Sequence, residues 1–115
     1  MKLITDEIRA ALLANGAASE KSGGSDDHKP VVKLFTPDGG ATWLITEMDP
    51  EEPDILFGLC DLGIGFPELG SVRLSEIESI SGAAGLKVER DLHFQAKHPI
   101  SVYADIASDK GSIVA

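Results

Sequence analysis

The chain has 115 residues, of which 43% are hydrophobic and 25% are charged, and this composition is typical of a globular chain with one modest core. Nineteen acidic residues against ten Lys and Arg give a net charge of −9 at pH 7. This charge disfavours direct binding to nucleic acid or to an anionic membrane and favours a basic protein partner.

Cysteine usage and the N-terminus indicate a cytoplasmic location. Cys60 is the sole cysteine, so no intrachain disulfide or cysteine-based zinc site can form. It stands in an apolar run, where we interpret it as a small buried hydrophobe. Asp6, Glu7 and Arg9 interrupt any signal-peptide core, and no segment has the length needed to span a membrane. We expect a single domain over residues 1–115.

The first predicted element is an amphipathic helix over residues 5–14. Thr5 is a good N-cap, and Asn15-Gly16 provides a stop signal. Small and polar residues then predict a flexible loop over about 15–30. His28 in this loop is expected to be solvated.

The next segment predicts an antiparallel hairpin. Strands are expected over Val31–Thr36 and Ala41–Glu47, joined by the turn signal Pro37-Asp38-Gly39-Gly40. Trp43 is expected to fill the core, and a ligand-stacking platform is the alternative.

An acidic loop and a buried strand follow. Residues 47–54 carry five acids and no base, but lack the glycine and glutamate positions of an EF-hand, so we expect a solvated loop. The apolar run Ile55–Leu62 predicts a central strand covered on both faces. Residues 63–70 form a loop punctuated by glycine and proline, without a dinucleotide fingerprint.

The last third predicts two short strands and two short helices. A strand is expected over Ser71–Leu74, and Ser75 with Glu78 has the spacing of a capping box before one helical turn. The clearest alternation in the chain predicts a strand over residues 86–94. A short helix is expected after Pro99, with a frayed tail over about 108–115.

The polar face of the 86–94 strand supplies the candidate catalytic residues. Glu89, Asp91 and His93 alternate along it, and a carboxylate beside a histidine suits acid–base transfer or a metal-activated water. Neighbours in such a row are about 6.5–7 Å apart, which is loose for one metal, so the site needs a further acid. The structural alternative is the polar outer face of an antiparallel sheet. The candidates for the further acid are Glu47, Asp61 and Glu68.

Arg90 falls on the apolar face of the same predicted strand. A buried guanidinium needs a carboxylate partner, and Glu47, Glu76 and Glu78 are the candidates. We predict a structural ion pair, with an anion-binding arginine as the alternative.

Three segments carry a resemblance to a known family. They are Phe35–Asp38 with Thr42-Trp43 and Thr46-Glu47, then the region from Phe57 to Ser79, and finally Gly85–Phe94. Together they resemble the DUF2958 family, small bacterial proteins often associated with plasmids and other mobile elements. The resemblance implies no catalytic residues.

The sequence predicts an α+β fold: an antiparallel sheet of about five strands with an N-terminal helix and one or two short helices. We expect a non-enzymatic accessory or interaction module with no cofactor. A small metal-assisted or acid–base enzyme using Glu89, Asp91 and His93 is the alternative. The sequence sets no oligomeric state.

Overall fold

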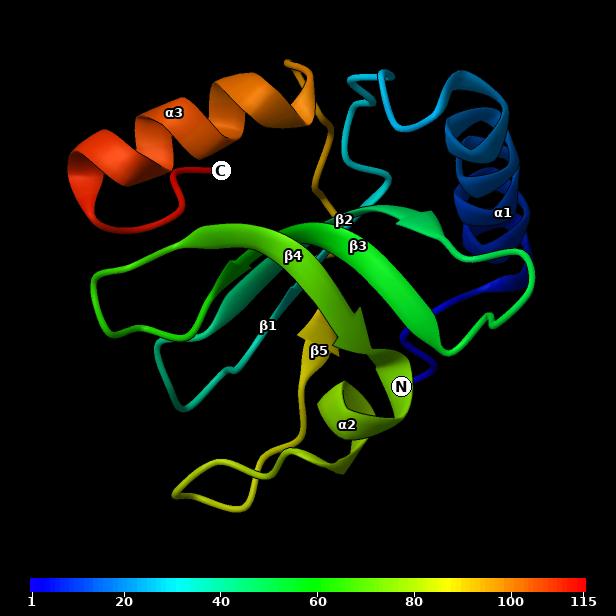
Figure 1. Cartoon of the computed structure of the whole chain (residues 1–115). Coiled ribbons are helices and arrows are strands. Elements are labelled where there is room, and N and C mark those ends of the chain that lie inside the picture. Colours follow the sequence, from blue (N-terminus) through cyan, green and yellow to red (C-terminus); the bar gives the residue numbers. More distant parts are fainter.

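A computed structural model describes all residues 1–115 and shows an α+β fold (Figure 1). The sheet has five strands in the order β4-β3-β2-β1-β5, and every neighbouring pair is antiparallel. The predicted fold class is therefore confirmed. The elements in chain order are α1 (Asp6–Ser22), β1 (Val32–Phe35), β2 (Thr42–Met48), β3 (Ile55–Asp61), β4 (Glu68–Arg73), α2 (Leu74–Ser79), β5 (Glu89–Arg90) and α3 (Ile100–Lys110).

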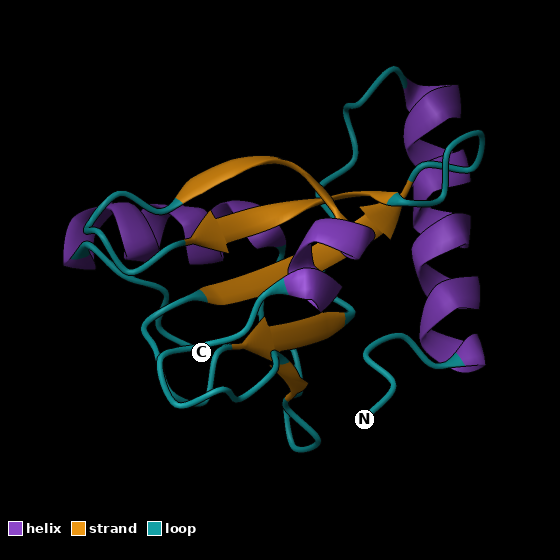
Figure 2. Cartoon of the chain, turned by 90° about the horizontal axis from the view of Figure 1, so that it is seen from below, coloured by secondary structure: helices purple, strands orange, loops and turns teal.

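Helices cover both faces of the sheet. Figure 1 shows α3 above the strands, α2 below them and α1 beside their ends, and Figure 2 shows α2 in front and α3 behind. One apolar cluster joins Trp43 and Leu56 to Leu12 of α1 and Ile77 of α2. A smaller cluster joins Leu44 and Leu59 of the sheet to Ile100, Tyr103 and Ala107 of α3. Strand β3, in the interior of the sheet, is thus buried on both sides, as its apolar sequence predicts. No helix is long and apolar enough to cross a bilayer.

Helix α1 continues well beyond its expected end. It runs to Ser22 and ends at Gly23, which adopts the left-handed conformation with φ +70°. The prediction of a loop from residue 15 was wrong because tertiary contacts use the two residues interpreted as a stop. Asn15 donates to the carbonyl of Thr46 at 2.9 Å, and Gly16 is buried against Met48 and Pro50.

The segment after α1 is held by contacts to the first turn of α3. Asp27 accepts hydrogen bonds from the backbone and hydroxyl of Ser101 in the first turn of α3. The carbonyl of His28 accepts the amide of Ile100 at 2.8 Å. Residues 27–28 therefore cap α3 from a distance, a role that no local pattern in the 15–30 segment indicates.

Strand β5 has only two residues, so the predicted strand over 86–94 was wrong in length. Phe35 pairs with Glu89 and Leu34 with Arg90, and the chain then turns because the amide of His93 bonds Asp91 at 2.8 Å. Before the strand, Lys87 bridges back to Ser81 instead of to β1. Leu86 and Leu92 are consequently exposed, although the alternation placed them in the core.

Helix α2 is capped by an acid distant in sequence. Asp54 accepts the amide of Ser75 at 2.9 Å and its hydroxyl at 2.7 Å. The predicted capping box was wrong because the Ser75 side chain turns to Asp54 instead of to its own helix. Arg73 occupies the N-cap position without a side-chain bond.

The C-terminal tail is packed instead of frayed. Helix α3 ends at Gly111, with φ +78°, and Ile113 packs against the α3 cluster. Asp61, only 3% exposed, accepts the amide of Ile113 at 3.0 Å and that of Gly63 at 2.8 Å. A buried acid at the end of β3 thus fixes both the β3–β4 loop and the tail.

Candidate functional site

A β-bulge in β2 determines where Glu47 points. Ile45 pairs with Gly58, whereas Glu47 pairs with Phe57, so Thr46 is an extra residue in the strand. Regular alternation would put Glu47 on the face of Trp43. The bulge instead places it opposite Phe57 on the other face, where Leu44 and Leu59 contact α3. Thr46 is kept in this geometry by its hydroxyl, which donates to the carbonyl of Phe57 at 3.1 Å.

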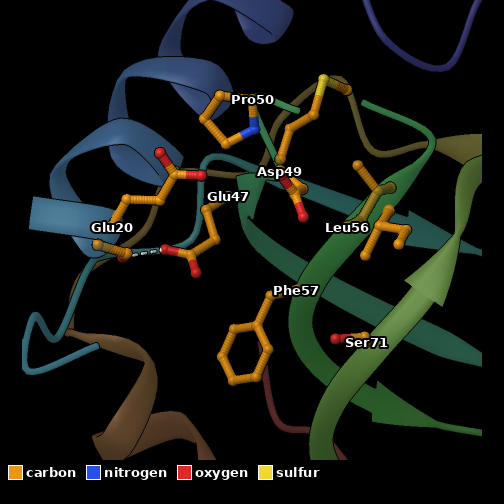
Figure 3. A pocket seen from close by; sticks show the side chains of 11 residues that line it. Glu20, Glu47, Asp49, Pro50, Leu56, Phe57 and Ser71 are labelled. Carbon is orange, nitrogen blue, oxygen red and sulfur yellow. Dashed lines mark hydrogen bonds between the residues drawn. The ribbon is translucent and has the colours of Figure 1, made fainter. Parts of the chain in front are cut away.

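Four polar side chains, Glu47 among them, form one cluster. Ser19 of α1 donates its hydroxyl to Oε2 of Glu47, the bond dashed in Figure 3. Nε2 of His28 lies 3.3 Å from the Ser19 hydroxyl, 3.8 Å from Glu47 and 3.7 Å from Asp26. The side chains of His28 and Glu47 are only 19% and 21% exposed. This Ser19–His28 cluster, with Asp26 and Glu47, links α1, the following segment and β2.

The geometry of the Ser19–His28 cluster differs from that of a nucleophilic triad. In a triad the acid orients the ring nitrogen opposite the one that faces the serine. Here Ser19, Asp26 and Glu47 all approach the same Nε2, and the serine proton goes to Glu47. No group of three or more His, Cys, Asp or Glu side chains is arranged to hold a metal ion. The cluster therefore positions the Glu47 carboxylate.

A cleft of about 260 Å³ opens beside Glu47, between α1 and the ends of β2 and β3 (Figure 3). Its charged lining consists of the carboxylates of Glu20, Glu47 and Asp49, without a Lys, Arg or His. The remaining lining is mostly small or apolar: Gly16, Ser19, Met48, Pro50, Ile55, Leu56, Phe57 and Ser71. Such a cleft suits an amphipathic cation, because a Lys or Arg side chain has an apolar stem and a charged head.

The sequence-predicted catalytic residues line two separate pockets. Glu89 borders one with Met1, whereas Asp91 and His93 border another. The Asp91 carboxylate is engaged: the His93 amide, and then Lys33 at 3.5 Å, hold its pKa below the ordinary value. The two-residue strand cannot present all three side chains in one row, and their catalytic role stays a prediction.

Arg90 has no carboxylate partner in the structure. Its Nη1 donates to the carbonyl of Lys2 and, at 3.1 Å, to that of Leu3. The predicted pairing with Glu47, Glu76 or Glu78 was wrong, since Nη1 of the guanidinium bonds backbone carbonyls of the N-terminal segment instead. The anion-binding alternative remains untested.

The remaining candidates from the sequence are Trp43, Cys60, Asp61 and Glu68, and the structure shows the surroundings of each. Trp43 is 2% exposed and packs in the main core, which leaves no face for a stacked ligand. Burial raises the pKa of the Cys60 thiol, which disfavours a thiolate nucleophile. Asp61 bonds backbone amides, and Glu68 is exposed on β4.

Sequence reasoning missed Ser19 and His28 because it placed both in a mobile loop. The available signal was the helical stripe: Leu12, Gly16 and Ser19 continue the spacing of Ile8 along one face of α1. Small residues on such a helical face can indicate close packing against a neighbouring element as well as the end of a helix. The expectation that His28 is solvated fails for the same reason, because its side chain is largely covered.

Comparison with known proteins gives a family and nothing narrower. No curated protein and no solved structure matches the chain. A family model described as a protein of unknown function, DUF2958, matches residues 3–114, nearly the whole chain. The resemblance seen in the sequence is thereby confirmed, and the chain belongs to the DUF2958 family.

Proposed function

We propose that the protein is a non-enzymatic interaction module that binds a basic protein partner through the acid-lined cleft. The observation that supports this most directly is the grouping of Glu20, Glu47 and Asp49 over an apolar floor without a cation in the lining. The net charge of −9 adds long-range attraction for such a partner. We place the module in the bacterial cytoplasm, as an accessory of plasmids or other mobile elements, in line with the family resemblance.

Glu47 is the central acid of the proposed contact. The hydroxyl of Ser19 holds one of its oxygens, so the carboxylate is oriented before a partner arrives. Preorganisation of this kind lowers the ordering cost of binding. A Lys or Arg side chain entering the cleft would pack its methylenes on Phe57 and Pro50 and bring its charge to Glu47 and Asp49.

Titration with short basic peptides tests this function. The probe is an acetylated and amidated Leu-Arg-Leu-Arg-Leu peptide, followed by amide NMR of the full chain. We expect saturable shifts around Glu20, Glu47 and Asp49 that weaken as salt is raised, and no such shifts with the matching Leu-Glu peptide.

Charge-matched variants separate the cleft from the general charge of the protein. We expect Glu47→Gln to weaken peptide binding about tenfold, or about 1.4 kcal/mol, which is less than the loss of a fully buried charged pair because the cleft is open to solvent. Asp105→Asn removes the same charge from an exposed position on α3 and should leave binding unchanged. Equal losses in both variants would mean that the peptide responds to net charge alone, and the proposed cleft would be abandoned.

A further inference from the structure

The second unusual surface of the molecule is the free edge of the sheet at β4. This strand pairs only with β3, and no element covers its other side. The amide of Leu74 bonds the carbonyl of Asp54 at 2.8 Å and continues the β3–β4 register. In an antiparallel ladder alternate residues face the partner strand, so Leu69, Ser71 and Arg73 direct their backbone groups outward.

The outward backbone groups of β4 are open to a partner. Their side of the strand has no neighbouring strand, no turn, loop or side-chain hydrogen bond reaches Leu69 or Ser71 there, and both residues are exposed. Of Arg73 only the amide is open, because its carbonyl belongs to the N-cap of α2. Proteins usually blunt such an edge with a proline, a bulge or charged side chains, lysine above all. The strand Glu68–Arg73 has no proline or bulge, its charged residues stand only at its two ends, and its ladder to β3 is regular. The edge is thus a ready template for another extended chain.

Exposed apolar side chains continue from this edge into the β3–β4 hairpin. Leu62, Ile64 and Phe66 are 61%, 69% and 74% exposed, and Leu69 on the strand is 45% exposed. The hairpin is not a loose loop, because Asp61 fixes the amide of Gly63 and Gly63 packs against Gly40. An occupant of the edge therefore meets a preformed apolar surface at one end.

The charges beside the edge indicate a basic occupant. Arg73 is the only cation on β4, and Glu52 at 3.2 Å and Asp54 at 3.6 Å already neutralise it. Glu68 and Glu76 on either side form no ion pair. A second copy of the chain would bring a net charge of −9 against the same charge, which disfavours self-pairing.

We propose that an extended segment of a basic protein, with alternating apolar and cationic residues, adds to β4 as a sixth strand. Its backbone bonds Leu69, Ser71 and Arg73, its apolar residues pack on the hairpin, and its cations meet Glu68 and Glu76. Glu76 lines a further pocket of about 250 Å³ beside Ser71 and Arg73 that receives one such side chain. The basic character of the occupant rests on the proposed function, whereas the edge itself does not.

The test uses a capped Lys-Val-Lys-Ile-Lys-Val-Lys peptide and the full chain. We expect saturable binding with slowed hydrogen exchange at the outward amides of Leu69, Ser71 and Arg73. The matched control is the same peptide with N-methyl groups on alternate amides, which keeps charge and apolar area but removes strand donors. We expect it to bind at least tenfold more weakly. Equal affinity of the two peptides, or no protection on β4, would overturn the proposal.

Protein variants separate the edge from the cleft. Leu69→Pro removes an outward amide at a position where an edge strand tolerates proline and which does not line the cleft, and Leu69→Val keeps that amide. We expect only the proline variant to lose the peptide-induced protection of the β4 amides, and we expect Glu47→Gln to keep that protection. Loss with Glu47→Gln alone would overturn the edge proposal and leave the cleft function standing. Concentration-dependent protection of β4 without peptide would show that a second copy occupies the edge instead.

Discussion

The backbone carbonyl of Met48 lies 2.0 Å from the point where a Cβ on Gly16 would stand. In the interior of an exposed helix, alanine is more favourable than glycine by about 1 kcal/mol, so Gly16→Ala would stabilise an isolated α1. In the folded protein the added methyl meets backbone atoms that cannot rotate away. We expect Gly16→Ala to lower the free energy of unfolding by about 1–3 kcal/mol, the usual cost of overpacking.

The control for Gly16→Ala is Ala17→Gly, an exposed position one residue further along α1. It should lower the free energy of unfolding by about 1 kcal/mol through helix propensity alone. Urea denaturation gives both values. A Gly16→Ala variant as stable as wild type would contradict the close approach of α1 to β2.

A second prediction concerns the buried carboxylate of Asp61. Its two oxygens accept the amides of Gly63 and Ile113, and both amides lose their partner in Asp61→Ala. A hydrogen bond to a charged group contributes about 1.5–3 kcal/mol, and water replaces part of it because Gly63 is exposed and Ile113 is half-buried, so we expect a loss of about 1–3 kcal/mol in urea denaturation. Asp61→Asn keeps an acceptor oxygen and should cost less.

Hydrogen exchange locates the effect of the Asp61 variant. The amide of Ile113 should exchange faster in Asp61→Ala, because the tail is released when its acceptor is removed. Asp105→Ala on the exposed face of α3 serves as the control and should stay within about 0.5 kcal/mol of wild type. An Ile113 amide that is equally protected in both variants would argue that apolar packing alone holds the tail.

The hairpin and the central strand were predictable from local pattern. The expected strands at Val31–Thr36, Ala41–Glu47 and Ile55–Leu62 match β1, β2 and β3 to within one residue at each end. Their apolar residues alternate or run continuously, and the turn Pro37–Gly40 carries its own backbone preferences. Local sequence is sufficient to predict the structure where the turn signal and the strand patterns on either side indicate the same hairpin.

The candidate site was not predictable in the same way, because it depends on contacts between distant residues. The bulge that directs Glu47 towards Phe57 is visible only in the pairing of β2 with β3. Ser19 and His28 reach Glu47 only because α1 continues past Gly16. The alternation of residues 86–94 predicted a strand that is too long, since β1 offers few backbone groups for β5 to pair with. An alternating pattern indicates a preference for strand structure, and the partner strand determines whether those residues pair.

A third prediction follows from the distant cap of α2. The hydroxyl of Ser75, and then its amide, hold the pKa of Asp54 below its ordinary value of 3.8. A lowered folded-state pKa means that the unfolded chain binds the proton more tightly. The contribution of Asp54 to stability is therefore present above about pH 4 and is lost as the pH falls through the lowered pKa.

Unfolding of wild type and Asp54→Asn between pH 7 and pH 2 measures this contribution. We expect wild type to be the more stable at neutral pH and the difference in urea midpoint to shrink at acid pH. Asp105→Asn, which changes the same charge away from any cap, should give a small and pH-independent difference. A constant difference for Asp54→Asn would show that the ionised form of the cap has no special role.

The last prediction concerns Arg90, which joins β5 to the N-terminal segment. Its guanidinium donates to the carbonyls of Lys2 and Leu3, and the neighbouring Leu3 and Ile4 side chains are buried in the main core. We expect Arg90→Met to cost about 1–2 kcal/mol, because a charged donor to two carbonyls is removed from a half-buried position. Arg90→Lys should recover part of the loss, since an ammonium still donates but lacks the fixed fork of the guanidinium.

The measurement for Arg90 is the amide NMR spectrum of the N-terminal segment together with urea denaturation. The Leu3 and Ile4 resonances should shift in Arg90→Met because their segment is released, while the resonances of β2 and β3 stay in place. Lys87→Met, an exposed position three residues earlier, controls for the loss of one positive charge. Unchanged resonances of Leu3 and Ile4 would mean that apolar burial alone anchors the N-terminus, and that the Arg90 guanidinium is free to serve the anion-binding role.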